Sequence, residues 1–557
     1  MERSKRDHIL FLAVISLFPL VFILVSLLLS GREELLTGLS AIWCNINAFV
    51  TDATAVGGLA SALLNAGLMG IFAVVILMLA RVPVSGRALG PLFLGMGAGM
   101  FGASVLTAIP IALGGFLYAF IRREAPPRPV RLALQCCTLS PALAALYFSA
   151  PGRCFGCGIL LGVLAGLAIG FCALPLALHT LSLHQGFNLY SMGIPLGVLG
   201  LLFFAVHREL VLVPENLAKE YTSPMLIGQP SPLFFYLLFA GFFALLLALG
   251  LLFHRPQSPP YTALLAHHGL EADFALHYGM PNVLLNMGLM GFLLLVYFLL
   301  VNAPFNGVAA GSLLCSLCWT GSGAHPRNTF PILFGYCFTA LLLSTPLNSP
   351  ELVIGACFAT GLAPISGRYG GLYGILAGTL HAFLMPAVLG LNGGFNMQTA
   401  AFVSGVVALF LYPLLHEISR RKNERQEQAA RSGVAGELLH GASRIVDGID
   451  DALAHVEADD QGPPETSHEV LFLHLRNILA CIAAILFFLS LLPFVSHILP
   501  GNYLRFAAYI LGALAYGSEI LVLTDVFRKR RPLREMLMPY IFGLLYIALG
   551  FSYLLGH

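Results

Sequence analysis

The chain has 557 residues, of which 58% are hydrophobic and 10% are charged, and its formal net charge is +2. A water-soluble domain carries about 25% charged residues, so this composition excludes a water-soluble fold. The long apolar runs are continuous, which predicts an all-α integral membrane protein whose helices span the bilayer.

Changes in composition along the chain predict six segments. In chain order they are 1–59, a first span and connector; 60–206, membrane repeat 1; 207–280, a connector with one span; 281–418, membrane repeat 2; 419–469, a polar cytoplasmic linker; and 470–557, a C-terminal three-helix membrane unit.

The two repeats are indicated by self-similarity. Leu63–Gly70 matches Leu284–Gly291 at seven of eight positions, and we call the step in numbering from Leu63 to Leu284 the repeat offset. The same offset keeps prolines and glycines in phase further along the chain, as in Pro83 with Pro304, Gly102 with Gly323, Pro110 with Pro331 and Gly114 with Gly335. Beyond these, Gly162–Gly166 resembles Gly374–Gly378, and Gly186-Phe187-Asn188 matches Gly394-Phe395-Asn396.

The distribution of basic residues predicts that the two repeats have inverted topology. Arg81, Arg87 and the arginines of 122–131 lie in loops of repeat 1, whereas the matching loops of repeat 2 contain no Lys or Arg. Repeat 2 instead ends in a basic run at Arg420. Because basic short loops mark the cytoplasmic side, the N-terminus is expected to be cytoplasmic. The glycine-rich runs 88–103 and 309–323 are too short for full spans and predict re-entrant or broken helices.

Polar residues that occur in apolar runs of both repeats are the candidates for binding a solute. Asn65 and Asn286 each offer an uncharged donor and acceptor, although such amides also hold helices together. Asn188 and Asn396 follow a Gly-Phe pair at the start of the last span of each repeat, where a helix cap is the alternative. The predicted substrate-binding residues are Asn65, Asn286, Asn188, Asn396, Gly186, Gly394, Phe187, Phe395, Thr320 and Ser322.

Within residues 60–206 and 281–415, each repeat contains one acidic residue, Glu124 or Glu351, and both fall in predicted loops. Cation-coupled carriers commonly keep a carboxylate in the membrane, so the sequence favours a neutral polar or anionic solute. No phosphate-binding loop or hydrolase motif is present, and we expect no enzyme, catalytic residue, cofactor or metal site. The expected partners are the solute and the lipid bilayer, with no nucleic acid; a homo-oligomer is compatible with the sequence.

The repeated Leu-Asn-x-Gly-Leu-x-Gly and Gly-Phe-Asn elements resemble an uncharacterised family of bacterial polytopic membrane proteins, known only as a domain of unknown function. The resemblance covers roughly residues 8–420 and implies a multi-pass protein of the bacterial plasma (inner) membrane. A distant likeness is to urea transporters, whose inverted halves carry a short Asn-Gly element. Here Gly186-Phe187-Asn188 is similar, but the Asn-Gly step is missing.

Taken together, these patterns predict a membrane transporter or channel for a small neutral polar or anionic solute, with the pathway between two inverted repeats. The alternatives are a non-transporting membrane scaffold or sensor, and an intramembrane enzyme.

Overall fold

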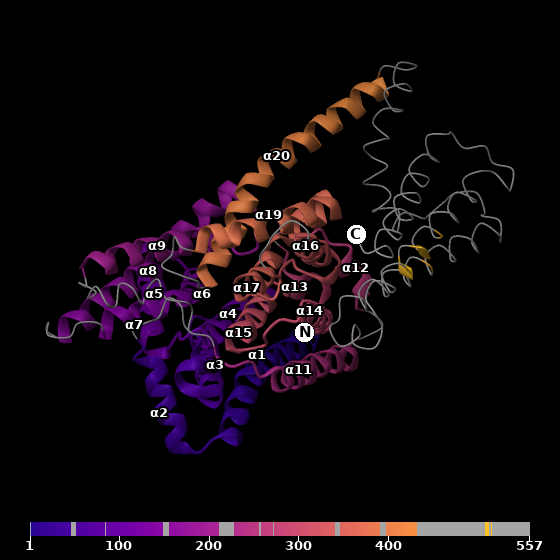
Figure 1. The fold of residues 1–557 in the computed structure, drawn as a ribbon. Coiled ribbons are helices and arrows are strands. Elements are labelled where there is room, and N and C mark those ends of the chain that lie inside the picture. Colours follow the sequence, from indigo (N-terminus) through magenta and orange to yellow (C-terminus); the bar gives the residue numbers. More distant parts are fainter. Residues whose placement is uncertain are drawn as a thin grey trace. The chain divides into compact units, whose positions relative to one another are not determined.

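The computed structural model of the protein describes residues 2–45, 52–83, 85–148, 155–210, 228–254, 258–270, 272–339, 346–389 and 397–431, with a few isolated positions between 479 and 514. Over these ranges the regular structure is entirely helical (Figure 1). Nine of the helical segments described are long and apolar enough to cross a membrane, which indicates a multi-pass membrane protein.

The chain divides into two compact units. The second consists of Tyr297–Asn302 and Ala454–His557, and it lies almost wholly outside the described residues, as does the predicted unit 470–557. The first unit, Met1–Val296 and Ala303–Leu453, contains all the helices named below except the last turn of one of them.

The first unit has two halves with the same order of long, short and interrupted helices. The first half contains α1 (Glu2–Leu29), α2 (Arg32–Trp43), α3 (Ala53–Leu79), η1 (Gly86–Ala88), α4 (Leu89–Met100), α5 (Val105–Arg122), α6 (Pro127–Cys136), η2 (Cys137–Leu139), α7 (Ser140–Phe148), α8 (Phe155–His184) and α9 (Gly193–Leu210). The second half contains α11 (Pro232–Phe253), α12 (Tyr261–Leu265), α13 (Phe274–Tyr278), α14 (Met280–Leu300), α15 (Gly307–Leu317), α16 (Pro326–Thr339), α17 (Pro350–Ala359), η3 (Thr360–Leu362), α18 (Ala363–Tyr369), α19 (Gly371–Leu389) and α20 (Met397–Arg431).

Unusual backbone conformations recur at the repeat offset found in the sequence. Within α3, Gly58 has φ 79° and ψ 164°, and Gly279, between α13 and α14, has φ 83° and ψ 156°. This region of backbone space is open essentially only to glycine. Arg81 and Asn302, which are also related by the repeat offset, both take left-handed conformations with φ of 53° and 51°. The single helix α3 therefore corresponds to α13 and α14 together.

The structural repeat begins earlier than the sequence patterns indicated. A Cβ atom placed on Gly70 of α3 would lie 2.8 Å from Pro19 of α1, so α1 packs directly against this glycine. The equivalent Gly291 of α14 meets Phe243 of α11 at 2.4 Å. Helices α1 and α11 therefore occupy corresponding places, although the sequence patterns left both outside the repeats.

The contacts of α8 and α19 correct the predicted alignment of their glycines. Gly170 would place a Cβ atom 1.8 Å from the Ile111 carbonyl oxygen, and Gly378 would place one 2.1 Å from that of Ile332. Since Ile111 and Ile332 are equivalent, Gly170 corresponds to Gly378. The sequence pairing of Gly166 with Gly378 is therefore wrong by one helical turn.

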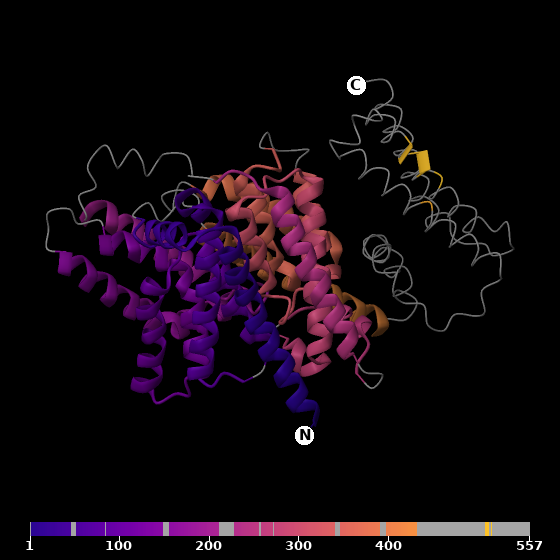
Figure 2. The same cartoon turned by 90° about the horizontal axis from the view of Figure 1, so that it is seen from below.

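Two short buried helices lie at the middle of the first unit. Every residue of α4 and of α15 is buried, and the helices have 12 and 11 residues. At 1.5 Å per residue, each is about 18 Å long or less, well short of the ~30 Å apolar core of a bilayer. In Figure 1 the purple helices α5–α8 and the pink-to-orange helices α16 and α19 lie on opposite sides of this pair, and Figure 2 shows the purple and the pink-to-orange helices on opposite sides again, seen from below.

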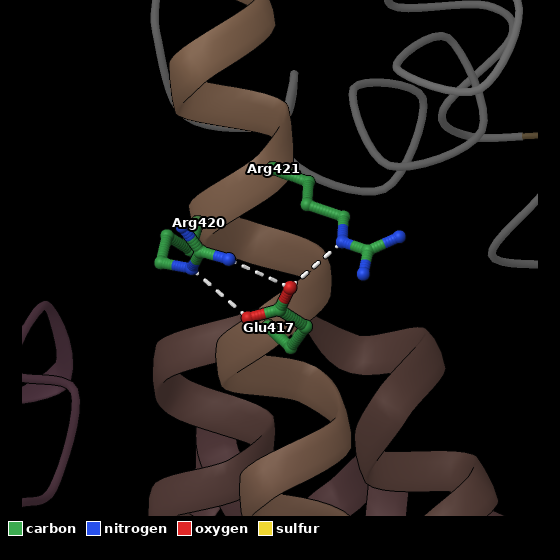
Figure 3. Close-up of polar contacts among 3 residues, drawn as sticks. All are labelled: Glu417, Arg420 and Arg421. Atoms are coloured by element: carbon green, nitrogen blue, oxygen red, sulfur yellow. Dashed lines mark hydrogen bonds and ion pairs between the residues drawn. The ribbon is translucent and has the colours of Figure 1, made fainter.

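Helix α20 changes from apolar to polar near its middle. Glu417 accepts hydrogen bonds from Arg420 at 2.8 and 2.9 Å and from Arg421 at 2.7 Å (Figure 3). The apolar segment that is long enough to span a membrane ends at Arg421, and the helix continues to Arg431. The ion pairs thus accompany the exit of α20 from its apolar part, and the helix runs on past the expected start of the linker at 419.

Candidate functional site

The amide of Asn65 ties α3 to the end of α4. Asn65 is fully buried. Its Nδ2 donates to the carbonyl oxygens of Gly99 and Ala103, both at 2.8 Å, and its Oδ1 accepts from Trp43 Nε1 at 2.8 Å. Both polar atoms of the Asn65 amide therefore have hydrogen-bond partners within the protein.

Asn286 makes the same arrangement in the second half. Its Nδ2 donates to the carbonyl oxygens of Thr320 and Ala324, both at 2.8 Å, and its Oδ1 accepts from the Tyr261 hydroxyl at 3.0 Å. The two carbonyl partners are related to those of Asn65 by the same repeat offset as the asparagines themselves. The fold thus gives both amides a structural role, and their contact with a solute stays a prediction.

A pair of equivalent carboxylates, Asp52 and Asp273, escaped the sequence analysis. Asp52 is fully buried and accepts from Thr54 N at 2.8 Å, Gly228 N at 3.0 Å and the backbone of Val308. Burial raises the pKa of the Asp52 carboxyl above its usual value, and these donors partly oppose that rise.

Asp273 makes the reciprocal contact from the second half. Its Oδ1 accepts from Gly86 N at 2.8 Å, at the start of η1, and from Leu276 N at 3.3 Å. Each carboxylate therefore reaches the start of the other half's short buried segment, where free N–H groups need acceptors. Extending the repeat offset a few positions upstream of the predicted repeats pairs Asp52 with Asp273 and would have found both.

We expect Asp52→Asn to lower the stability of the purified protein by about 1–3 kcal/mol, because an amide nitrogen would face backbone donors. Thermal unfolding in detergent measures the loss. Asp273→Asn is the matched comparison, and it should cost less because Asp273 is half-exposed. Equal losses would contradict the unequal burial of the two carboxylates.

The short helices α4 and α15 pack against each other in opposite directions. A Cβ atom on Gly86 would meet the Gly321 carbonyl oxygen at 1.9 Å, and one on Gly97 would meet the Gly311 carbonyl oxygen at 2.5 Å. Gly90, in turn, is nearest to Cys318. The repeat offset makes Gly90 equivalent to Gly311 and Gly97 equivalent to Cys318. Exchanging the two halves therefore turns the contact between Gly97 and Gly311 into the contact between Cys318 and Gly90.

Two spans are interrupted by 3₁₀ turns at matching places, between α6 and α7 and between α17 and α18. Each turn accepts a hydrogen bond from a residue of the other half. Leu189 N, after α8, donates to the Gly361 carbonyl oxygen of η3 at 2.9 Å, and Gln398 Nε2 of α20 donates to that of Thr138 in η2. Thr138 and Gly361 are the middle residues of the two turns and therefore hold matching places, while their donors differ, one being a backbone N–H and the other a side-chain amide.

The Tyr190 side chain lies where these elements meet. Tyr190 is buried and shares a side-chain hydrogen bond with Thr138. Its ring lies 5.2 Å from that of Trp319, just after α15, and 6.4 Å from that of Phe358 in α17. Tyr190 therefore joins η2, the end of α15 and α17 in one cluster, which we call the centre.

Two polar atoms on α6 and α7 have no hydrogen-bond partner. They are Gln135 Oε1 and Ser140 Oγ, and their residues are 8% and 0% exposed. Gln135 lies beside α4, because a Cβ atom on Gly90 would be 3.9 Å from its Nε2 and 3.9 Å from the Cys318 carbonyl oxygen. Unpaired buried polar atoms are rare in native proteins, and each one needs a reason.

Tyr336, His381 and Ser404 form a buried polar cluster in the second half. In contrast to Gln135 and Ser140, these side chains have hydrogen-bond partners. The His381 imidazole bonds the Tyr336 hydroxyl through Nδ1 and Ser404 Oγ through Nε2, the latter at 2.9 Å. Ser404 in turn donates to the Phe358 carbonyl oxygen at 3.0 Å. This cluster ties α16, α19, α20 and α17 together, so it fits a packing role.

Four of the predicted solute-binding residues lie near the centre, with local partners. Asn188 Nδ2 donates to the Tyr190 carbonyl oxygen at 3.0 Å, and its Oδ1 accepts from Tyr190 N at 3.2 Å. Thr320 donates to the Leu317 carbonyl oxygen at 2.6 Å, and Ser322 follows in the same turn after α15. Gly186 has φ 86°, a conformation that favours glycine.

The Phe187 ring is stacked between those of Tyr369 and Tyr412, with ring centres 5.2 and 4.9 Å away. The predicted counterparts of this element in repeat 2, Gly394, Phe395 and Asn396, lie outside the described residues. The repeated Gly-Phe-Asn element is therefore described in one copy.

Comparison with known proteins places the chain in a group without an assigned activity. The sequence model of the family described as "Protein of unknown function (DUF1576)" matches residues 31–209 and 259–417, more than half of the chain. No curated protein and no solved structure matches the chain. The expected resemblance to an uncharacterised family is confirmed by this match, which says nothing about a likeness to urea transporters.

Proposed function

Because the chain belongs to the family described as "Protein of unknown function (DUF1576)", whose description assigns no activity, we propose its function from its own geometry. We propose a transporter or channel of the bacterial plasma membrane that moves a small neutral polar or anionic solute. The pathway passes through the centre, between two inverted halves, and the N-terminus is cytoplasmic.

The reciprocal contacts between α4 and α15 support the inversion. Two equivalent helices that pack in opposite directions, with contacts that exchange, are related by a twofold axis perpendicular to both. If the helices run across the bilayer, that axis lies in the membrane plane, as in transporters built from inverted repeats. The reciprocal bonds of Asp52 and Asp273 support the same relation.

The observation that carries the transport proposal is that two buried atoms, Gln135 Oε1 and Ser140 Oγ, have no hydrogen-bond partner. Most polar side chains of the centre have protein partners, whereas these two buried atoms, on one interrupted span, have none. A buried polar atom without a partner costs about 1–3 kcal/mol, and a passing solute supplies the missing bond.

Flux measurements in proteoliposomes test the proposal. We expect purified protein to raise the uptake of at least one of urea, glycerol and L-lactate above that of empty liposomes. Asn188→Leu, which opens the turn beside Tyr190, should reduce that uptake. Uptake equal to that of empty liposomes for all three solutes would favour the scaffold alternative.

The inversion has its own test, by labelling from one side of the membrane. Single cysteines introduced by Glu124→Cys and Asn348→Cys lie in equivalent loops, and peptide mass spectrometry separates their labelling from that of the native cysteines. In right-side-out vesicles we expect a membrane-impermeant maleimide to reach position 348 at once and position 124 only after lysis. Labelling of both positions in the same compartment would remove the inverted arrangement.

A further inference from the structure

An arginine lies one helical turn away from the unpaired Gln135. Arg131 and Gln135 are both in α6, four residues apart, so their side chains lie on the same face with Cβ atoms about 6 Å apart. Arg131 is half-buried within a segment long enough to span the membrane.

The surroundings of Arg131 are predominantly positive. It interacts electrostatically with Arg87 and Arg128, and with the carboxylate of Asp273. No hydrogen bond or ion pair holds the Arg131 side chain within the ranges the structure describes. The like charges of Arg128 and Arg131 repel each other, and an anion beside Arg131 relieves that repulsion.

The second half has no counterpart for these groups. The repeat offset places Val308 opposite Arg87, and the slightly larger offset that relates Thr138 to Gly361 places Phe358 opposite Gln135 and Ala363 opposite Ser140. The helices repeat, but Arg87, Gln135 and Ser140 face apolar residues at the equivalent positions of the second half. Recognition of the solute therefore falls to this half.

We propose that the solute is a small organic anion that also carries an O–H or N–H donor, such as a hydroxycarboxylate. Its anionic group lies at Arg131, and its donor reaches Gln135 Oε1. This inference rests on the proposed transport function and names its substrate class. Guanidinium groups form strong charge-assisted bonds with carboxylates, and an unpaired acceptor selects for ligands that donate.

Three solutes of similar size test both parts of the inference. L-Lactate carries the charge and the hydroxyl donor, propionate lacks the hydroxyl, and lactamide lacks the charge. We measure tracer uptake at pH 8 by proteoliposomes, corrected for empty liposomes, and the shift in unfolding temperature in detergent. We expect wild-type protein to prefer lactate about tenfold over propionate and roughly ten- to a hundredfold over lactamide.

Two variants assign each preference to its residue. Gln135→Met should remove the preference over propionate and keep the preference over lactamide. Arg131→Gln should do the reverse, whereas Arg122→Gln, which removes an exposed arginine at the end of α5, should leave both preferences unchanged. Gln135→Met should also leave the stability of the solute-free protein unchanged or raised, because it removes an unpaired atom.

The two readouts separate the failure of this inference from that of the transport function. Uptake without either preference overturns the inference and leaves transport standing. Selective thermal shifts without uptake sustain the inference and overturn transport. Neither uptake nor selective thermal shifts would overturn both.

Discussion

Replacing Asn65 with leucine is expected to lower the free energy of unfolding by between about 2 and 5 kcal/mol. The change leaves two buried carbonyl oxygens, of Gly99 and Ala103, and the Trp43 indole N–H without their partner. The lower bound reflects the modest strength of hydrogen bonds between helices in membranes. Thermal unfolding of purified protein in detergent measures the loss.

Asn286→Leu should cost a similar amount, because its two carbonyl partners are equivalent. Ser140→Ala is the control, since the hydroxyl it removes has no partner, and it should leave the unfolding temperature unchanged or raise it. If Asn65→Leu instead preserved stability and abolished solute uptake, Asn65 would be the solute-binding residue that the sequence predicts, and the structural role would be lost.

The other large effect is expected at the crossing of α5 and α8. Gly170→Ala places a Cβ atom 1.8 Å from the Ile111 carbonyl oxygen, so the two backbones must move apart. Crowding of this kind costs about 1–3 kcal/mol or more, and here the opposing atom is backbone and cannot rotate away. We expect a large drop in unfolding temperature and a lower yield of monodisperse protein.

The matched control for this crossing is Gly241→Ala in α11, where no atom lies within 4 Å of the new Cβ. Alanine is favoured over glycine in a helix by about 1 kcal/mol, so this variant should be neutral or stabilising. Gly378→Ala should resemble Gly170→Ala. A stable Gly170→Ala protein beside an unstable Gly166→Ala protein would restore the alignment that the sequence indicated.

The sequence predicted the helical class, the repeat and its register over residues 63 to 114, because glycines, prolines and an asparagine mark fixed backbone positions there. It failed in α8, where Gly158, Gly162, Gly166 and Gly170 recur at every fourth residue. Such a run has the same pattern after a shift of one turn. The contacts across the helix crossing, such as that of Gly170 with Ile111, select the register.

The candidate site was harder to predict than the fold. Repetition drew attention to Asn65 and Asn286, but repeated polar residues are also those that hold the repeated scaffold together. Gln135 has no polar counterpart in the second half, so a search for similarity passes over it. The sequence marks Arg131 only as a residue of the cytoplasmic side, since its proximity to Gln135 requires a helix at that point.

The exchange of carboxylates between the halves has a consequence for synthesis in the cell. Gly86 emerges from the ribosome 187 residues before Asp273, its acceptor. At about 5–20 residues per second, the first half waits roughly 10–40 seconds for that partner. During this interval Asp52, too, lacks the Val308 donor, so the newly inserted first half is an incomplete intermediate until the later helices enter the bilayer.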